Sequence, residues 1–185
     1  IPALLEMNYT NVLSQVGGGA DFRDHFVCIS QLWTSLWGYG GSAKGCIDGL
    51  SFMVGKTHIL LSVFTLFSFI LLFFYKKIKL NSKDKENVFF VLLFSVFSIF
   101  SIFLMLDLSK FFWEILKPME IFQYPWRFLT VLSFTISFIS GGLIWIVGKF
   151  LKGYYLWILT FVIIFLAVVL NVKFFVPQTV IQKTS

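Results

Sequence analysis

The side chain with the clearest chemistry in this 185-residue chain is Arg127, in the stretch FQYPWRFL at residues 122–129. A guanidinium is a planar fork of N–H donors that binds phosphoryl or carboxylate oxygens at two points. Two interpretations fit this position. Arg127 is either an interface anchor that meets any lipid phosphate or pairs with Glu114 or Glu120, or it is the clamp for a specific phosphate ligand.

The residues beside Arg127 place it at the start of a predicted membrane helix. Pro125 suits the first turn of that helix, because its missing N–H would have no partner there. Tyr124 and Trp126 are typical of the aromatic belt at a membrane surface. We therefore include Tyr124, Trp126 and Arg127 in one candidate binding site.

A second group of candidate residues lies in the stretch DFRDHF, which brings Asp21, Arg23, Asp24 and His25 together. Asp21 precedes Asp24 by three residues and His25 by four, the spacing at which metal ligands share a helix face. The stretch is either a metal or acid–base cluster or the polar side of a helix on the membrane surface. The pattern favours the structural interpretation, so we assign no metal ligand and expect Asp21 to cap the helix that follows.

The composition sets the fold class. Hydrophobic residues make up 58% of the chain and charged residues 13%, about half the charged fraction of a soluble domain. Four stretches of about 19 or 20 residues contain no Asp, Glu, Lys or Arg and have membrane length. They must be helical in lipid: 57–75, 88–106, 128–147 and 154–172. The sequence predicts an all-α integral membrane protein with four transmembrane helices.

Lysine residues predict the orientation of these helices. The connection 76–87 holds five lysines and the connection 148–153 holds two. The positive-inside rule places both in the cytoplasm, and we expect the membrane to be the cytoplasmic (inner) membrane of a bacterium. Residues 1–56, the loop 107–127 and the tail 173–185 then lie outside. The net charge of +6 follows from this topology, so we expect no nucleic-acid partner.

Two interfacial helices are predicted in the outer segments. Apolar residues from Phe22 to Leu36 recur at spacings of three and four, which predicts a helix over about 22–37. A second apolar face predicts an amphipathic helix over 107–117 that ends before Pro118. Both helices should lie at headgroup depth.

Small residues recur along three of the predicted spans and indicate faces where helices pack closely. The sets are Ser62, Thr65 and Ser68; Ser95, Ser98 and Ser101; and Ser133, Ser137 and Gly141. A polar substrate path is the alternative interpretation of these stripes.

The two cysteines, Cys28 and Cys46, are too few for a disulfide framework. They lie in a predicted outer segment, where oxidising conditions allow a bond. The sequence does not give their geometry, so both the paired and the free states stay open.

The order of several motifs resembles that of a known family. PALLE, FRDHFV, QLW, WGYGGS, DGLSFMVGKTHILL and FQYPWRFL follow one another over most of residues 2–129. Together they are similar to the YfhO-like bacterial membrane proteins, which are grouped with the GT-C superfamily of glycosyltransferases. That family often has a proline before WGYGG, where this chain has Leu36. The resemblance implies a polytopic helical fold with an active site on the extracytoplasmic face.

The same resemblance implies a polyprenyl-phosphate-linked sugar donor, used to modify a cell-envelope glycan. Arg127 would hold the donor phosphate, and Asp24, His25 and Asp48 would line the outer cavity, with Arg23 among the same binding residues. The catalytic acid of such enzymes is usually in the first outer loop. We therefore expect this chain to be the C-terminal part of a membrane domain, and assign no catalytic residue. The expected partners are membrane lipid and the upstream part of the same polypeptide, and a divalent metal is one candidate cofactor.

Two other functions stay open: a lipid or polysaccharide transporter, and a non-catalytic membrane subunit of envelope assembly. Transporters usually carry ionisable residues or broken helices at the middle of the membrane. The four predicted spans contain no Asp, Glu, Lys or Arg, which argues against transport.

Overall fold

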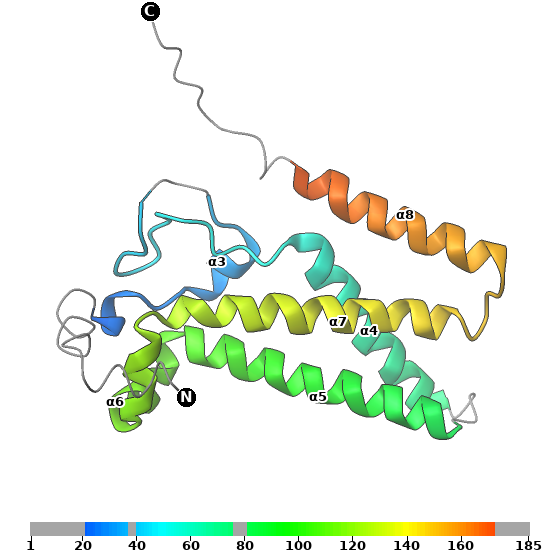
Figure 1. The fold of residues 1–185 in the computed structure, drawn as a ribbon, viewed down its shortest axis with the longest axis horizontal. Coiled ribbons are helices and arrows are strands. Elements are labelled where there is room, and N and C mark those ends of the chain that lie inside the picture. The colour runs from blue at the N-terminus through cyan, green and yellow to red at the C-terminus, as the bar shows by residue number, and fades with distance from the viewer. Residues whose placement is uncertain (1–20, 37–39, 76–80, 173–185) are drawn as a thin grey trace, which may run out of the picture. The chain divides into compact units, whose positions relative to one another are not determined.

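The long helices of the chain coincide closely with its apolar stretches. The computed structural model describes residues 21–36, 40–75 and 81–172, which form helices and loops and contain no strand (Figure 1). The long helices are α4 (Lys56–Tyr75), α5 (Ser82–Met105), α7 (Leu129–Val147) and α8 (Tyr154–Asn171). The short ones are η1 (Phe22–Asp24), α3 (Ile29–Trp33), η2 (Asp107–Ser109), α6 (Lys110–Ile115), η3 (Lys117–Phe122) and η4 (Pro125–Phe128).

Among the described residues, three helices are long and apolar enough to cross a membrane. They are Ser82–Met105, Pro125–Val147 and Tyr154–Asn171. The first of the four predicted spans coincides with α4, but there the apolar stretch with membrane-like composition is the shorter segment Lys56–Leu71. That α4 crosses a membrane therefore stays a prediction, as does the kind of membrane in which the helices lie.

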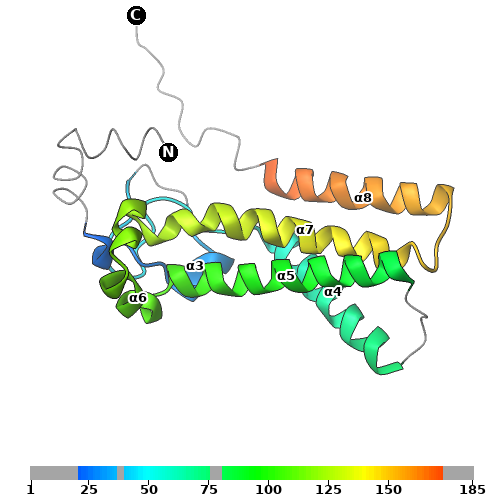
Figure 2. The ribbon, with the colours of Figure 1, turned by 60° about the horizontal axis from the view of Figure 1, so that its bottom comes forward.

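The chain divides into two compact units, and α5 and α7 each contribute to both. Unit 1 consists of Ile1–Val54 and Leu92–Ile136, and unit 2 of Gly55–Val91 and Ser137–Ser185. In both units the neighbouring parts of α5 and α7 lie side by side (Figure 2).

The core of unit 1 joins the segment before α4 to the paired helices. Its buried apolar residues come from α3 and the residues before it, from the segment just before α4, from the end of α5 and from the first half of α7: Val27, Leu32, Phe52, Met105, Leu132 and Ile136. A buried polar contact accompanies them, since the Ser98 hydroxyl donates to Thr135 Oγ1 at 2.7 Å. This core fixes the segment 21–54 against the helix ends that carry Arg127.

The prediction of one helix over about 22–37 is wrong. The segment instead forms the short turns η1 and α3, with extended backbone between them. The cause lies in long-range contacts. The Val27 N–H donates to the Met105 carbonyl at 2.9 Å, and Cys28 is bonded to Cys46, so neither residue continues a helix. Asp21 does cap the first turn, as predicted, because its carboxylate accepts from the Arg23 N–H at 3.0 Å.

The second predicted interfacial helix, over 107–117, is present in a broken form, as η2 followed by α6 and then η3. Its predicted apolar face, including Leu108, Phe111 and Ile115, is exposed, as expected for side chains that meet lipid. Trp113, which the pattern left unassigned, is fully buried.

In unit 2 the predicted small-residue stripe of α4 does pack against α7, but the α7 residues that meet it, Ser140 and Gly142, are outside the predicted α7 stripe. The Ser62 and Ser140 hydroxyls lie 3.0 Å apart, and a methyl group on Gly142 would lie 3.0 Å from Thr65 Cγ2. At one end of this unit Lys149 pairs with the nearly buried Asp84, which joins the two lysine-bearing connections.

The stripe of Ser133, Ser137 and Gly141 behaves differently from the prediction. Ser137 and Gly141 are exposed, and a methyl group on Gly141 would meet no atom within 4 Å. The face of α7 that packs closely is the one carrying Thr135, Ile139 and Gly142. At Gly141, therefore, the predicted stripe leaves open space instead of a close contact with another described helix.

Candidate functional site

The candidate site of unit 1 is a cluster of polar and aromatic side chains beside Arg127. Trp126 Nε1 donates to Ser42 Oγ at 2.9 Å, and the same oxygen lies 2.7 Å from His25 Nδ1. The Tyr124 ring stacks on Trp126 with centroids 5.5 Å apart and meets the edge of the His25 ring at 4.8 Å. Residues separated by about a hundred positions therefore share one small site.

Two hydrogen bonds meet at the Ser42 hydroxyl. Trp126 Nε1 donates to Ser42 Oγ, because an indole nitrogen only donates. His25 Nδ1 lies 2.7 Å from the same oxygen, and either atom can be the donor, depending on the tautomer of His25. The His25 ring is therefore held at Nδ1, and its other nitrogen, Nε2, is not part of this contact.

A strained turn presents Tyr124, Trp126 and Arg127. Gln123 has φ 58°, a left-handed conformation that is uncommon for a residue other than glycine. It turns the chain from η3 into η4, whose first residue is Pro125, as the sequence predicted. The Arg127 N–H donates to the Tyr124 carbonyl at 3.1 Å and closes the turn.

Arg127 itself is exposed, and its contacts are with neutral groups. Its Nη2 donates to Gln123 Oε1 at 3.0 Å, and its guanidinium carbon lies 5.3 Å from the centre of the Tyr124 ring. Among the side chains that the structure describes, no carboxylate forms an ion pair with Arg127. The predicted partner Glu114 pairs with Arg23 instead, and the Glu120 side chain lies outside the described set.

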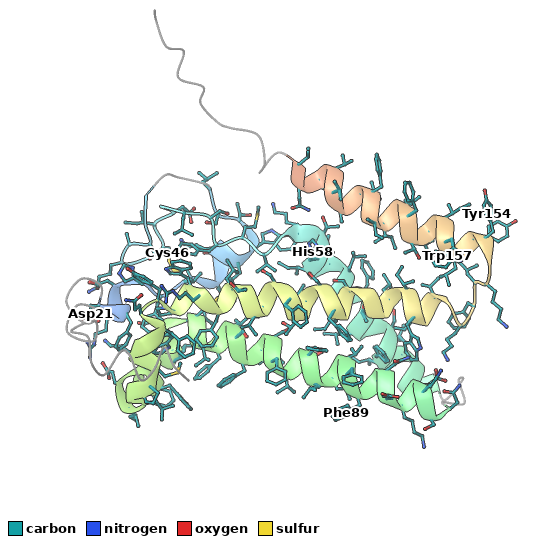
Figure 3. All side chains as sticks on the ribbon, in the orientation of Figure 1. Asp21, Cys46, His58, Phe89, Tyr154 and Trp157 are labelled. Carbon is teal, nitrogen blue, oxygen red and sulfur yellow. A yellow bond between two sulfur atoms is a disulfide. The ribbon has the colours of Figure 1, made fainter. Side chains whose placement is uncertain are left out.

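The loop that carries Ser42 is held by close backbone contact. The Gly40 N–H donates to the Gly49 carbonyl at 3.0 Å. A methyl group on Gly49 would lie 1.9 Å from the Gly41 carbonyl oxygen, so only glycine fits there. A disulfide bond between Cys28 and Cys46 ties the same loop to the start of α3; Cys46 is labelled in Figure 3. The cysteines, left open by the sequence, are therefore paired.

Asp48 supports the loop at a third point. Its carboxylate accepts from Gln31 Nε2 at 2.8 Å, from the Ser35 hydroxyl at 2.7 Å and from the Leu36 N–H at 3.1 Å. The Ser35 hydrogen bond, followed by those from Gln31 and Leu36, lowers the pKa of Asp48 below its ordinary value despite partial burial. Sequence reasoning placed Asp48 in a binding cavity; its contacts here are those of a carboxylate that holds a loop.

The Asp48 contacts predict a pH-dependent stability. Because the folded-state pKa is lowered, the carboxylate contributes stability above its unfolded pKa of about 3.9, and this contribution is lost as pH falls through the folded pKa. We expect Asp48→Asn to lower the free energy of unfolding at pH 7 by about 1.5–3 kcal/mol. Denaturation of both proteins between pH 7 and pH 3 should show the difference unchanged down to about pH 5 and shrinking below about pH 4. A difference that persists at pH 3 would contradict this role.

The remaining predicted site residues have different partners. Arg23 pairs with Asp21 at 3.2 Å and with Glu114 at 3.1 Å, and Asp24 pairs with Lys44 at 3.2 Å. The hydrogen bond that Arg23 donates to Glu114 raises the pKa of Arg23, and the hydrogen bond that the Arg23 backbone N–H donates to Asp21 lowers the pKa of Asp21. Of the DFRDHF stretch, only His25 makes a recorded contact with the residues around Arg127.

The cluster chemistry suits an organic ligand better than a metal ion. Within residues 21–36, 40–75 and 81–172, no three His, Cys, Asp or Glu side chains gather where they could hold a metal. The groups beside Arg127 are an indole, a phenol, a hydroxyl and an imidazole. Such a set offers hydrogen bonds and aromatic faces, which are the usual lining of small-molecule sites.

Two members of the cluster were missed from the sequence. Ser42 had no local signal beyond its place at the end of the WGYGGS motif, four residues before Cys46. Gln123 looked like an ordinary polar residue in an aromatic run, and only its backbone conformation reveals its part in the turn.

Comparison with known proteins identified no similar protein. No protein-family model, curated protein or solved structure matches the chain. The similarity to YfhO-like proteins therefore rests on the motifs alone and stays a prediction.

Proposed function

We propose that this chain belongs to a membrane protein that binds a polyprenyl-phosphate-linked sugar at its extracytoplasmic surface, and that Arg127 binds the phosphate. The observation that carries the proposal is the exposure of Arg127 and the kind of groups that it contacts. It is an exposed cation at the start of a membrane-length helix, held by Gln123 and Tyr124 rather than neutralised by a described carboxylate. A guanidinium held in this way keeps donors free for phosphoryl oxygens.

The cluster beside Arg127 offers groups that a sugar could use. The His25 ring and the partly exposed rings of Tyr124 and Trp126 lie next to the proposed phosphate position, and Ser42 orients His25. Aromatic faces next to a few directed hydrogen-bonding groups are typical of sites for small polar ligands. The predicted depth at the membrane surface suits a donor whose lipid tail stays in the bilayer.

In this proposal the whole protein is a glycosyltransferase of the GT-C type. The acceptor hydroxyl attacks the anomeric carbon, the bond from that carbon to the phosphate oxygen breaks, and a base takes the acceptor proton. Negative charge develops on the departing polyprenyl phosphate, where Arg127 would stabilise it. The catalytic base is expected elsewhere in the protein, so this chain supplies the donor site.

One observation favours a non-catalytic lipid-binding subunit as the second candidate. The carboxylates of Asp21 and Asp24 form ion pairs with neighbouring residues, and that of Asp48 accepts a hydrogen bond from Ser35. A carboxylate engaged in this way is poorly suited to act as a general base. Both candidates share the same phosphate site and differ in whether sugar is transferred.

The experiment that tests the phosphate site measures binding of a short-chain polyprenyl phosphate to the detergent-solubilised chain. We expect Arg127→Ala to weaken binding about 10- to 100-fold, in line with the loss of charged hydrogen bonds, and Arg127→Lys to weaken it less. Lys110→Ala is the matched control, because Lys110 is another exposed cation in the same predicted outer segment. It should change binding less than twofold.

Two results would refute the proposal. Equal effects of Arg127→Ala and Lys110→Ala would show that binding depends only on general surface charge. Equal competition by phosphatidylglycerol and by the polyprenyl phosphate would make Arg127 an anchor for bulk lipid.

A further inference from the structure

Unit 2 contains a groove that the proposed function does not use. It lies between the first half of α5 and the second half of α7 and encloses about 330 Å³. That volume is at the lower end of the range found for small-molecule sites, about 300–1,000 Å³. Its lining is mainly aromatic and small, with one amide at the end: Phe90, Phe138, Trp145, Ser137, Gly141 and Asn87.

Adjacent glycines give the groove its depth. A methyl group on Gly142 would press against Thr65 Cγ2 at 3.0 Å and Val91 Cγ2 at 3.2 Å, so Gly142 brings α7 close to α4 and α5. A methyl group on Gly141 would meet nothing within 4 Å. Gly142 is thus required for helix packing, whereas Gly141 leaves open space in the groove.

The end of the groove at Asn87 is positively charged. Lys83 precedes Asn87 by four residues on α5 and therefore lies on the same side of the helix, one turn further toward its start. Past the end of α7, the Lys149 ammonium lies over the ring of the lining residue Trp145 at 5.1 Å, but it is paired with the buried Asp84. The positive charge available to a ligand at this end is therefore that of the exposed Lys83.

We propose that this groove binds an anionic phospholipid, with one acyl chain along the aromatic lining and the phosphate beside Lys83. Charge complementarity selects this occupant, because an apolar groove that ends at an exposed lysine matches a lipid with an apolar chain and a negative headgroup. Basic pockets between membrane helices on the cytoplasmic side are known to bind anionic headgroups. The site is in unit 2, separate from the residues around Arg127.

A second protein helix is the competing occupant. The exposed Ser137 and Gly141 would let a helix approach closely, as small residues do in membrane interfaces. A helix of ordinary composition gains nothing from Lys83, however, whereas a phosphate gains about 1 kcal/mol from each lysine near it, or about fivefold in affinity. The two occupants therefore predict different effects of lysine substitution.

The test is native mass spectrometry of the full 185-residue chain in detergent, titrated with dioleoyl phosphatidylglycerol or dioleoyl phosphatidylcholine. We expect the first phosphatidylglycerol molecule to bind at least fivefold more tightly than phosphatidylcholine. Lys83→Gln should reduce this preference about fivefold. Lys85→Gln is the matched control, since Lys85 lies two residues from Asn87 and so on the other side of α5, and the preference should be kept.

A second variant tests the groove itself. Gly141→Leu places a side chain in the open space and should weaken binding of the first lipid of either kind, while Gly141→Ala tests the same space with a smaller group if the leucine variant is unstable. Equal losses in Lys83→Gln and Lys85→Gln would overturn the proposal, as would unchanged lipid binding in both Gly141 variants. Loss of a dimer in Gly141→Leu without loss of lipid would assign the groove to a second copy of the chain.

Discussion

Replacing Trp113 with alanine should lower the free energy of unfolding by about 3–5 kcal/mol, the range for large aromatic residues in a packed core. Trp113 is fully buried although it belongs to a six-residue helix in an interfacial segment. Its ring stacks on Phe22 with centroids 5.5 Å apart and meets Phe128 edge-on at 6.1 Å. One side chain thus joins the start of the described chain, α6 and the turn before α7.

Trp113 also donates a hydrogen bond to one of the last carbonyls of α5. The last carbonyls of a helix have no partner within the helix. Here Trp113 Nε1 donates to the Leu104 carbonyl at 3.1 Å, the Ser109 hydroxyl donates to the same oxygen, and the Val27 N–H donates to the Met105 carbonyl. The end of α5 is predicted to lie in the membrane, where an unpaired carbonyl costs several kcal/mol, so we expect these donors to matter more than they would in water.

Trp113→Phe separates the two contributions. Phenylalanine keeps most of the packing and removes the indole N–H, while Ser109 still serves the Leu104 carbonyl. We expect this variant to lose about 0.5–1.5 kcal/mol. Phe111→Ala is the matched control, since Phe111 is an exposed aromatic residue of the same helix and should lose less than about 1 kcal/mol.

Denaturant-induced unfolding in a fixed detergent measures all three variants. Equal losses for Trp113→Phe and Trp113→Ala would mean that the hydrogen bond, and not the packing, accounts for the effect. A loss in Phe111→Ala as large as that in Trp113→Ala would mean that α6 is not anchored by its buried tryptophan.

The membrane-length helices were predictable because their signal is local. A run of apolar residues of the right length must be helical in lipid whatever its neighbours are. The boundaries of α7 and α8 accordingly agree with 128–147 and 154–172 within one residue. The α5 helix begins six residues before the predicted span, at Ser82, because Asn81 and Asp84 exchange hydrogen bonds that extend its first turn.

The segments predicted to lie outside the membrane were less predictable, because distant contacts decide their structure. The period of apolar residues from Phe22 to Leu36 is that of a helix, yet the backbone bond from Val27 to Met105 and the bond from Cys28 to Cys46 override it. Neither contact leaves a trace in the local pattern. Local propensity is a weak prior that tertiary contacts often overrule.

The residues of the candidate site also differ in whether a local sequence pattern could reveal them. Arg127, Tyr124 and Trp126 are neighbours in sequence, so a motif could reveal them together. His25 was selected for its own chemistry, but its contact with Ser42 and Tyr124 depends on a loop that closes across the chain. Asp48 was selected as a carboxylate in an outer segment, and only its three donors show that it holds that loop.

Breaking the bond between Cys28 and Cys46 should lower the free energy of unfolding by about 3 kcal/mol. The cysteines are 18 residues apart, and a cross-link that closes a loop of about that length reduces the entropy of the unfolded chain by roughly this amount. For a chain of this size the loss corresponds to a fall in melting temperature of about 6–12 °C. The variant to test carries Cys28→Ser and Cys46→Ser together, which avoids an unpaired thiol.

A reducing agent provides an internal control for this experiment. Cys46 is exposed, so a reductant reaches the bond in the folded protein. Reduction should lower the melting temperature of the original chain to that of the double-serine variant and leave the variant unchanged. A reductant that shifts both proteins equally would show that it acts on something other than this bond.

The contributions of the disulfide and of the Asp48 hydrogen bonds to the free energy of unfolding should also depend on each other. Both connect the start of α3 and the residues after it with residues 46–48, and so hold the loop that presents Ser42 to His25 and Trp126. Once one tie is lost, the loop can separate from α3, and the remaining tie contributes less in the folded state. We expect Asp48→Asn to cost at least 0.5 kcal/mol less in the double-serine background than in the original chain, a coupling within the range of residues that share a contact network. Strict additivity would mean that the two ties stabilise independent parts of the segment, and the Ser42 loop would then retain its geometry when either one is removed.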